Sequence, residues 1–193
     1  MIDYYAWGTG NGRRPLIMLE EADIPYRLIP TNIREGDQKK PEFLKINPYG
    51  KIPALVDPDG PGDKPATVFE SCAILLYLGE KSGKFMGKDA AARVDVLKWL
   101  MFAAASVLPI VGALRNYPDM TVDAERVLDV MENRLGSHDY LAGDYSIADM
   151  AAVTRFTNMT ESPLFTSRSN VKRWYETVIA RPAADKALTL KFG

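Results

Sequence analysis

A short glycine-rich turn, residues 8–12, holds the first side chains of this sequence that could take part in chemistry. It has the sequence Gly-Thr-Gly-Asn-Gly and follows an aromatic run at residues 4–7. The hydroxyl of Thr9 and the amide of Asn11 can donate hydrogen bonds, and glycines let a backbone approach a ligand closely. A helical pattern starts directly after the turn, and helix N-termini favour anions. We therefore expect an anion-binding site here, although a turn in which Asn11 only caps the helix would have the same residues.

The sequence offers few residues for other nucleophilic or metal chemistry. Cys72 is its only cysteine and His138 its only histidine. This composition excludes an intramolecular disulfide, a CxxC redox pair and a cysteine-rich zinc site. His138 lies in a polar segment typical of a solvated turn, and Cys72 is expected to be a small packing residue. We predict no bound metal, and we expect a bound molecule to supply the sulfur for any thiol chemistry.

Composition limits the partners and the location of the protein. The chain has 193 residues, a formal net charge of −1, 47% hydrophobic residues and 25% charged residues. This balance is typical of a globular protein and gives no electrostatic reason for nucleic-acid binding. No apolar run approaches the roughly 20 residues of a membrane span, and the first residues lack a basic segment followed by an apolar one. We expect a cytoplasmic protein that binds neither nucleic acid nor membranes.

The first part of the chain alternates strand and helix patterns. We predict strands at 2–7 and 26–33 with a helix at 13–23 between them, a short helical or irregular stretch at 38–47, a hairpin at 51–70 and a helix at 70–83. Pro30 indicates that the second strand ends early or lies at a sheet edge, and Gly83 ends the last helix. In that helix, the spacing of Ala73, Leu76 and Tyr77 predicts the buried face.

The pattern becomes helical throughout after residue 89. We predict a long apolar helix at 91–114 that bends or breaks near Pro109, followed by helices within 121–135, 145–159 and 170–182. Ser146 and Asp149 have the spacing of a capping box, in which each side chain bonds the backbone of the other residue. The fold class is therefore α/β plus all-α.

Three segments together resemble cytosolic glutathione transferases. They are NPYGKIPALVD at 47–57, FESCAILLYL at 69–78 and YLAGDYSIADMA at 140–151, and the similarity extends from end to end. The resemblance implies a thioredoxin-like, glutathione-binding domain at 1–83 and a linker at 84–88. It also implies an all-helical domain at 89–193 that contributes the second-substrate pocket and the contacts of a homodimer.

The resemblance also implies roles for individual residues in binding glutathione. Thr9 and Asn11 resemble the Nu class of bacterial glutathione transferases, whose typical activity is glutathione-dependent reduction of disulfides. The family has a cis peptide at the position of Ile52–Pro53, where the backbone of Ile52 would bind the cysteinyl part of glutathione. The remaining expected glutathione contacts are Glu70 and Ser71 for the γ-glutamyl end and Gln38 and Lys51 for the glycyl end.

Ionising the thiol of glutathione requires more than the helix N-terminus. A free thiol has a pKa of about 8.5, and lowering it by two units takes about 2.7 kcal/mol. A helix N-terminus supplies about 0.3–1 kcal/mol, and a hydrogen bond to a charged group about 1.5–3 kcal/mol. We therefore expect Thr9, with the backbone or side-chain amide of Asn11, to donate to the sulfur. Tyr4 and Tyr5 are alternative donors, but inside a strand they are expected to serve packing.

The sequence leaves three functions open. They are the reduction of small disulfides by glutathione, the conjugation of glutathione to carbon electrophiles, and a non-catalytic binding module of the same fold. The segment at 106–121 is shorter than in Nu-class relatives, where this region forms part of the electrophile site and supplies a basic contact across the dimer. Arg115 and Arg126 are candidates for that contact.

Overall fold

The computed structural model describes residues 1–114 and 116–192, and their contacts divide the chain into two compact units. Residues Met1–Ser82 and 183–192 form the first unit, and Gly83–Pro182 form the second.

A four-stranded mixed sheet is the centre of the first unit. Its strands lie in the order β2 (Tyr26–Pro30), β1 (Ile2–Ala6), β3 (Ala54–Gly60) and β4 (Lys64–Phe69). β1 runs parallel to β2 and antiparallel to β3, which in turn is antiparallel to β4. β1 and β4 therefore run in the same direction and end at the same edge of the sheet, where β3 begins. β2 is an edge strand and ends at Pro30, in agreement with the expectation from this proline.

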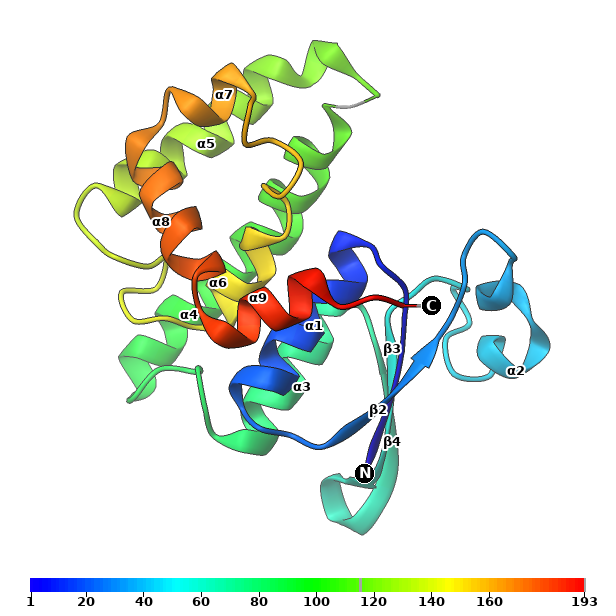
Figure 1. Ribbon diagram of the computed structural model, residues 1–193. Coiled ribbons are helices and arrows are strands. Elements are labelled where there is room, and N and C mark those ends of the chain that lie inside the picture. The colour runs from blue at the N-terminus through cyan, green and yellow to red at the C-terminus, as the bar shows by residue number, and fades with distance from the viewer. Residues whose placement is uncertain (115, 193) are drawn as a thin grey trace. The chain divides into compact units, whose positions relative to one another are not determined.

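Helices cover both faces of this sheet (Figure 1). α1 (Gly10–Glu21) and α3 (Ser71–Ser82) lie on one face, and the short helix α2 (Pro41–Leu44), preceded by the 3-10 turn η1 (Asp37–Lys39), lies on the other. A second 3-10 turn, η2 (Pro61–Asp63), joins β3 to β4. The architecture is the predicted thioredoxin-like fold.

Alternate residues of β1 reach the two helical layers. The buried hydroxyl of Tyr4 donates to the carbonyl of Gly12 in α1 at 2.8 Å. The ring of Tyr5 points to the other face and meets Phe43 of α2 edge to face, with ring centroids 6.0 Å apart. The strand thus fixes both helical layers through side chains one residue apart.

The buried face of α3 differs from the predicted one. Ala73 is exposed, and Leu76 and Tyr77 are half-buried. The buried residues of α3 are Ser71, Cys72, Ile74, Leu75, Leu78 and Gly79. α3 carries apolar residues on nearly all of its surface, so periodicity did not identify the face that packs on the sheet.

The last helix of the chain, α9 (Pro182–Thr189), was not predicted, and residues 183–192 belong to the first unit. Arg13 of α1 donates to the carbonyl of Ala187 at 2.7 Å and to that of Leu190 at 3.1 Å. Lys186 pairs with Glu20 of α1 at 2.6 Å. These contacts group the end of the chain with α1 in the first unit.

The second unit is helical. It contains α4 (Ala90–Phe102), η3 (Ala103–Val111), η4 (Pro118–Met120), α5 (Thr121–Leu135), α6 (Ile147–Val153), α7 (Pro163–Thr166) and α8 (Ser169–Ile179). The predicted break near Pro109 is absent from this described stretch. The helix instead continues from α4 into the π-helical segment η3, which contains Pro109.

The sequence predicted no apolar segment of membrane-spanning length, but α4 and η3 together form one. Ala90–Val111 is 22 residues long and apolar enough to cross a membrane by length and composition. A single helix of this kind is weak evidence for a membrane span, because helices of water-soluble proteins can meet the same criteria.

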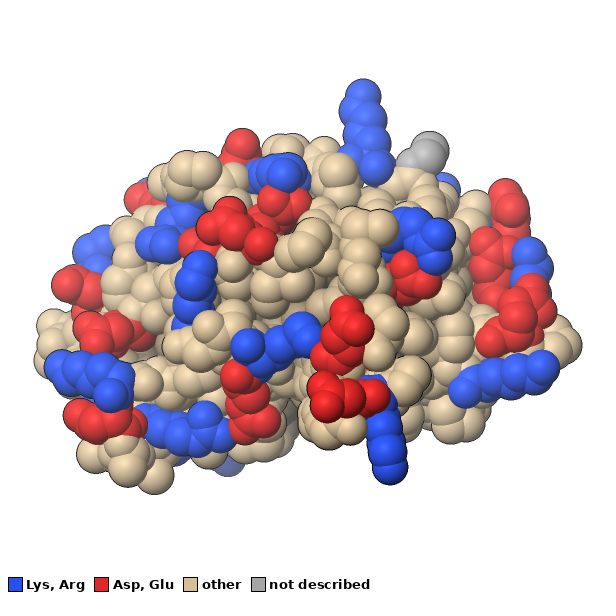
Figure 2. Space-filling view, turned by 90° about the horizontal axis from the view of Figure 1, so that it is seen from below, with Lys and Arg blue, Asp and Glu red and all other residues tan. Residues whose placement is uncertain are grey.

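Charged side chains of both signs are interspersed on the face drawn in Figure 2. This mixture agrees with the formal net charge of −1 and gives that face no strong attraction for polyanions.

The predicted capping box is confirmed in the second unit. Ser146 caps α6, and the Oδ2 atom of Asp149 accepts from the backbone N–H and the hydroxyl of Ser146 at 3.0 and 3.2 Å. Its Oδ1 atom accepts from the N–H of Leu141 at 3.0 Å and from the indole of Trp174 at 2.8 Å. Burial raises the pKa of Asp149 to about 6, while these hydrogen bonds favour the ionised form. The carboxylate is ionised at neutral pH and joins three segments.

We predict that Asp149→Asn lowers the free energy of unfolding at pH 7 by about 3 kcal/mol. Either orientation of the new amide places an NH2 group against at least one buried N–H group, that of Ser146 on one side or those of Leu141 and Trp174 on the other. Asp144→Asn is the control, because Asp144 is exposed and near the same helix. Urea unfolding followed by circular dichroism measures both changes, and equal effects of the two substitutions would contradict the prediction.

Candidate functional site

A cavity of about 290 Å³ lies at the sheet edge where β1 and β4 end and β3 begins. The residues that line it are Asn11, Asn47, Tyr49, Lys51, Ile52, Pro53, Glu70 and Ser71. They come from the first turn of α1, the loop before β3 and the start of α3. Most of the predicted site residues therefore meet at one cavity, whereas Thr9 and Gln38 do not line it.

Thr9 is the N-cap of α1. Its Oγ1 atom accepts from the N–H of Gly12 at 3.1 Å, with Thr9 itself in an extended conformation. The oxygen is used as an acceptor, so the hydroxyl proton of Thr9 can be donated elsewhere.

Within the glycine run, the structure requires a glycine at position 12, for a reason that the sequence did not show. A Cβ atom added to Gly12 would lie 2.2 Å from the carbonyl oxygen of Trp7, closer than any real contact. A Cβ on Gly8 would meet only ordinary contacts, at 3.5 Å or more. Gly12 thus permits a close approach between α1 and the preceding loop, within the protein itself.

Asn11 is exposed and lines the cavity, and its side-chain amide is hydrogen-bonded to Arg14. Its Oδ1 atom accepts from Nη1 of Arg14 at 2.7 Å. The same nitrogen donates to Oγ of Ser71 at 3.0 Å, and Arg14 is only 1% exposed. Sequence reasoning missed Arg14. A signal existed, because Arg14 has the helical spacing of the buried residues Ile17 and Met18 and is thus a charge on an apolar face.

The loop before β3 is shaped by Asn47, which the sequence analysis also missed. The buried Asn47 donates from Nδ2 to the carbonyl of Lys51 at 2.6 Å and accepts the N–H of Tyr49 at 3.0 Å. Gly50 has a φ of +64°, which favours glycine in this turn. The signal for the turn was the Asn-Pro-Tyr-Gly sequence itself.

Lys51 and Ile52 follow this turn at the mouth of the cavity. Nζ of Lys51 donates to the hydroxyl of Tyr49 at 2.8 Å and lies 4.3 Å from the centre of its ring. The Ile52–Pro53 peptide bond is cis, as the family resemblance implied.

Glu70 has an unusual backbone conformation for a residue other than glycine. Its φ is +69°, a left-handed conformation that costs on the order of 1 kcal/mol or more. Its exposed side chain and Ser71, the first residue of α3, both line the cavity. Strained residues of this kind occur preferentially at binding sites.

Gln38 lies beside the loop rather than in the cavity. Its carbonyl oxygen would be 3.2 Å from a Cβ atom on Gly50. Its side chain donates to the carbonyl of Ile33 at 3.4 Å, and Gln38 is not among the residues that line the cavity.

The alternative groups of the sequence analysis do not line this cavity. Burial raises the pKa of the Cys72 thiol, although the charge of Arg14 acts in the opposite direction. Burial likewise raises the pKa of the Tyr4 hydroxyl, which is bonded to Gly12. Neither group is poised to ionise at neutral pH.

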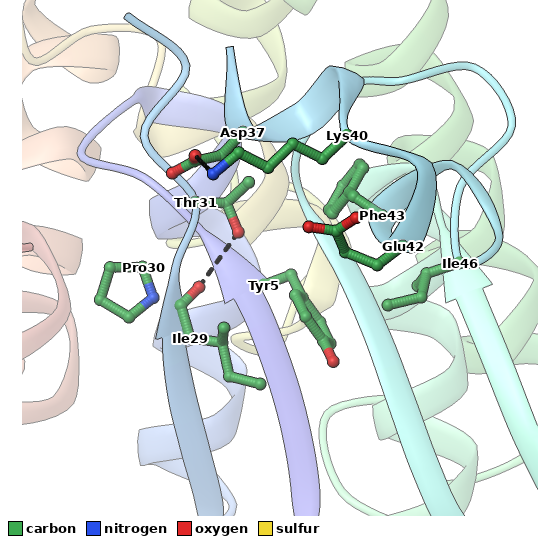
Figure 3. Close-up of a pocket in the computed structure, with 9 residues that line it drawn as sticks. All are labelled: Tyr5, Ile29, Pro30, Thr31, Asp37, Lys40, Glu42, Phe43 and Ile46. Carbon is green, nitrogen blue, oxygen red and sulfur yellow. Dashed lines mark hydrogen bonds and ion pairs between the residues drawn. The ribbon is translucent and has the colours of Figure 1, made fainter. Parts of the chain in front are cut away.

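A second cavity of about 250 Å³ lies on the face of the sheet that α2 covers (Figure 3). Tyr5, Phe43 and Ile46 supply apolar surface, and the ion pair of Asp37 with Lys40, at 2.6 Å, lies at one end. None of the predicted site residues lines it, so the first cavity is the candidate site.

The candidate site has the charges to bind a ligand with anionic ends and one cationic group. The N-termini of α1 and α3 both point to it, and Lys51 adds a positive charge at its mouth. Glu70 provides the one carboxylate among the lining residues. The described residues contain no group of three or more His, Cys, Asp or Glu residues that could hold a metal ion.

Comparisons with known proteins decide the family. The model of the "Glutathione S-transferase, N-terminal domain" matches residues 11–81, and that of the "Glutathione S-transferase, C-terminal domain" matches residues 116–182. The chain belongs to the glutathione S-transferase family. This family includes glutathione transferases and disulfide-bond oxidoreductases, and the chain is an enzyme of this kind. Its function depends on glutathione.

Relatives cover nearly the whole of this glutathione transferase. It is 36% identical to the disulfide-bond oxidoreductase YfcG of Escherichia coli K12, an alignment covering 97% of this chain and 94% of the relative. A glutathione transferase of Pseudomonas putida, solved with one glutathione disulfide per subunit, has a TM-score of 0.93 at 32% identity over 98% of this chain and 91% of that one. One from Pseudomonas fluorescens, solved with two glutathiones bound, has a TM-score of 0.90 at 36% identity over 97% and 92%.

We predict that Gly12→Ala lowers the free energy of unfolding by about 1–3 kcal/mol, because the added methyl group must displace the backbone at Trp7. Gly8→Ala, in the loop that precedes α1, is the control and should change stability by under about 0.5 kcal/mol. Thermal unfolding of the two variants measures the difference. A stable Gly12→Ala variant would show that the loop can move without loss.

Proposed function

We propose that this glutathione transferase reduces small disulfides with glutathione as the reductant. The observation that carries the proposal is the convergence of Asn11, Ile52, Glu70 and Ser71 on one cavity beneath two helix N-termini. These groups match the charges of glutathione, which has two carboxylates, one ammonium group and a thiol that must ionise.

Each part of glutathione has a complementary group in the cavity. Ser71, at the N-terminus of α3, binds the γ-glutamyl carboxylate, and Glu70 binds the adjacent ammonium group. The backbone of Ile52 binds the cysteinyl part as an added strand would, beside the first residue of β3. Lys51 attracts the glycyl carboxylate, with Gln38 beside the same loop. In this orientation the thiol lies at the N-terminus of α1.

Thr9 and Asn11 stabilise the thiolate in this proposal. Asn11 lines the cavity with its amide NH2 directed away from Arg14, and Thr9 retains its hydroxyl proton while capping α1. One or two such hydrogen bonds, with the helix N-terminus, supply the roughly 2.7 kcal/mol needed to lower the thiol pKa by two units.

The reaction proceeds by two thiol–disulfide exchanges without a protein nucleophile. The bound thiolate attacks one sulfur of a small disulfide, forms a mixed disulfide and releases the other sulfur as a thiolate, which takes up a proton. A second glutathione thiolate then attacks the glutathione sulfur of the mixed disulfide and releases the remaining substrate thiol. One disulfide is reduced, and two glutathiones are oxidised to one glutathione disulfide.

The relatives favour disulfide reduction over the alternatives. YfcG is named a disulfide-bond oxidoreductase, and the two Pseudomonas structures contain glutathione disulfide or two glutathiones. The Thr9-Gly10-Asn11 sequence supports placing the chain in the Nu class. Conjugation of carbon electrophiles would use the same thiolate, whereas a non-catalytic module would not need these donors.

We also propose that the protein is a cytoplasmic homodimer. Val94 and Met101 lie seven residues apart on one face of α4 and are 64% and 50% exposed, which suits contact with a second copy. The side chain of Arg126 is 76% exposed and forms one surface ion pair, with Asp123 at 3.7 Å, so it remains accessible to a second copy. Arg115 lies outside the described residues.

Two assays test the proposed activity. We expect turnover of a mixed disulfide of glutathione and a small thiol, and conjugation of a chlorinated nitroaromatic at least about tenfold slower in kcat/KM. The reverse order would establish the conjugating function instead. If calorimetry detects no binding at millimolar glutathione, the proposed activity is wrong and a binding module becomes the better description.

Substitution of Thr9 tests its role at the sulfur. Thr9→Ala should raise the apparent pKa of bound glutathione by about one unit with little loss of affinity, and should cost about 1 kcal/mol of stability through loss of the cap. Thr9→Ser keeps the hydroxyl and should restore both properties. Thiolate absorbance titration measures the pKa, and an unchanged value in Thr9→Ala would assign the sulfur contact to Asn11 alone.

A further inference from the structure

One buried guanidinium links the two ends of the candidate site. Arg14 is 1% exposed, and its Nη1 atom donates both to Oδ1 of Asn11, at 2.7 Å, and to Oγ of Ser71, at 3.0 Å. Asn11 lies in the first turn of α1 and Ser71 is the first residue of α3. Both line the cavity from which Arg14 itself is excluded.

The guanidinium determines which way these two groups can donate. A guanidinium has five N–H donors and no acceptor, so each atom that faces it must be an acceptor. The amide of Asn11 must therefore turn its oxygen toward Arg14, which leaves its NH2 group on the other side. Ser71 accepts through its oxygen, which leaves its hydroxyl proton for another partner.

We propose that Arg14 is a positioning residue that holds both Asn11 and Ser71 as hydrogen-bond donors toward an anionic ligand. The inference rests on the proposed function and deepens it. The amide of Asn11 then faces the thiolate of glutathione and the hydroxyl of Ser71 faces its γ-glutamyl carboxylate. Both groups can donate or accept when free, and Arg14 removes the orientation in which an oxygen would face an anion.

The charge of Arg14 acts in the same direction as its hydrogen bonds. Amides and hydroxyls polarised by a cationic donor are stronger donors to their next partner. Arg14 also lowers the pKa of the nearby Cys72 thiol, although burial outweighs this effect there. A sulfur in the cavity, which lacks that burial, would experience the favourable charge without the opposing desolvation.

A purely structural role for Arg14 predicts a different outcome. An arginine that only joins α1 to α3 would change stability when replaced, and the pKa of the bound thiol would stay the same. The test therefore reads out ionisation and binding separately from folding. Thiolate absorbance titration gives the pKa of bound glutathione, and calorimetry gives the Kd of S-methylglutathione, which cannot ionise at sulfur.

Arg14→Met and Arg14→Lys are the variants, with Arg13→Met as the matched control. Arg13 is the adjacent residue on α1, but its guanidinium donates to the carbonyls of Ala187 and Leu190. We expect Arg14→Met to raise the thiol pKa by about one unit and to weaken S-methylglutathione binding about tenfold. Arg14→Lys keeps the charge but loses the planar guanidinium. It should raise the thiol pKa by about half a unit and weaken S-methylglutathione binding about threefold. Arg13→Met should change neither quantity.

A double-mutant cycle tests whether Arg14 acts through Asn11. In an Asn11→Ala background, Arg14→Lys should no longer change the thiol pKa, while its effect on S-methylglutathione binding, exerted through Ser71, should persist. If Arg14→Met fails to fold, Arg14→Lys and this cycle carry the test.

Each possible outcome has a definite meaning. Wild-type protein that binds no glutathione would overturn the proposed function and this inference with it. Wild-type protein that binds glutathione with a lowered thiol pKa, while folded Arg14 variants match it in both pKa and Kd, would overturn the inference alone. An equal pKa effect of Arg14→Lys with and without Asn11 would show that Arg14 does not act on the thiol through Asn11, and would also overturn the inference.

Discussion

The common direction of β1 and β4 is the constraint on which the site depends. Since both strands end at one edge of the sheet, the helices that follow them begin there and present two N-termini to the same space. β3 begins at that edge too, which brings the Ile52–Pro53 step between them. Three segments distant in sequence therefore converge because of strand direction alone. Arg14 then joins α1 to α3 at the point of convergence.

In the proposed function, this arrangement favours anionic ligands through the placement of hydrogen-bond donors rather than through net charge. The chain is nearly neutral, with charges of both signs interspersed on the face in Figure 2, yet the cavity is lined by donors from helix ends, Asn11, Ser71 and Lys51. Helix N-termini and polarised side chains act over short distances, where they are little screened. Glu70 supplies the one lining carboxylate, so a ligand with a single ammonium group among its anionic groups is favoured.

The sequence predicted the fold well because its signals were local. Alternating strand and helix patterns, the hairpin and the Ser146–Asp149 box each depend on residues close in sequence, and the motif resemblance predicted the thioredoxin-like fold and the cavity loop. The failures depend on tertiary packing. The face of α3 was ambiguous because apolar residues surround it, and α9 is held by Arg13 through contacts more than 170 residues away in sequence. Arg14 was missed because its hydrogen bond to Ser71 forms only when α1 packs on α3, and the two residues are 57 positions apart in sequence.

The raised pKa of Cys72 explains why, in the proposed reaction, the reactive sulfur comes from glutathione and not from the protein. Cys72 follows Ser71 at the N-terminus of α3 and lies within the influence of Arg14, two features that ordinarily lower a thiol pKa. Burial nevertheless raises the pKa of Cys72, against the charge of Arg14 and the hydrogen bond of Ser71. The same positive environment therefore acts differently on two sulfurs according to their access to solvent. If the protein activates the thiol of glutathione as proposed, the burial of Cys72 has a consequence for the reaction, because a second thiolate in the same environment would compete for the disulfide substrate.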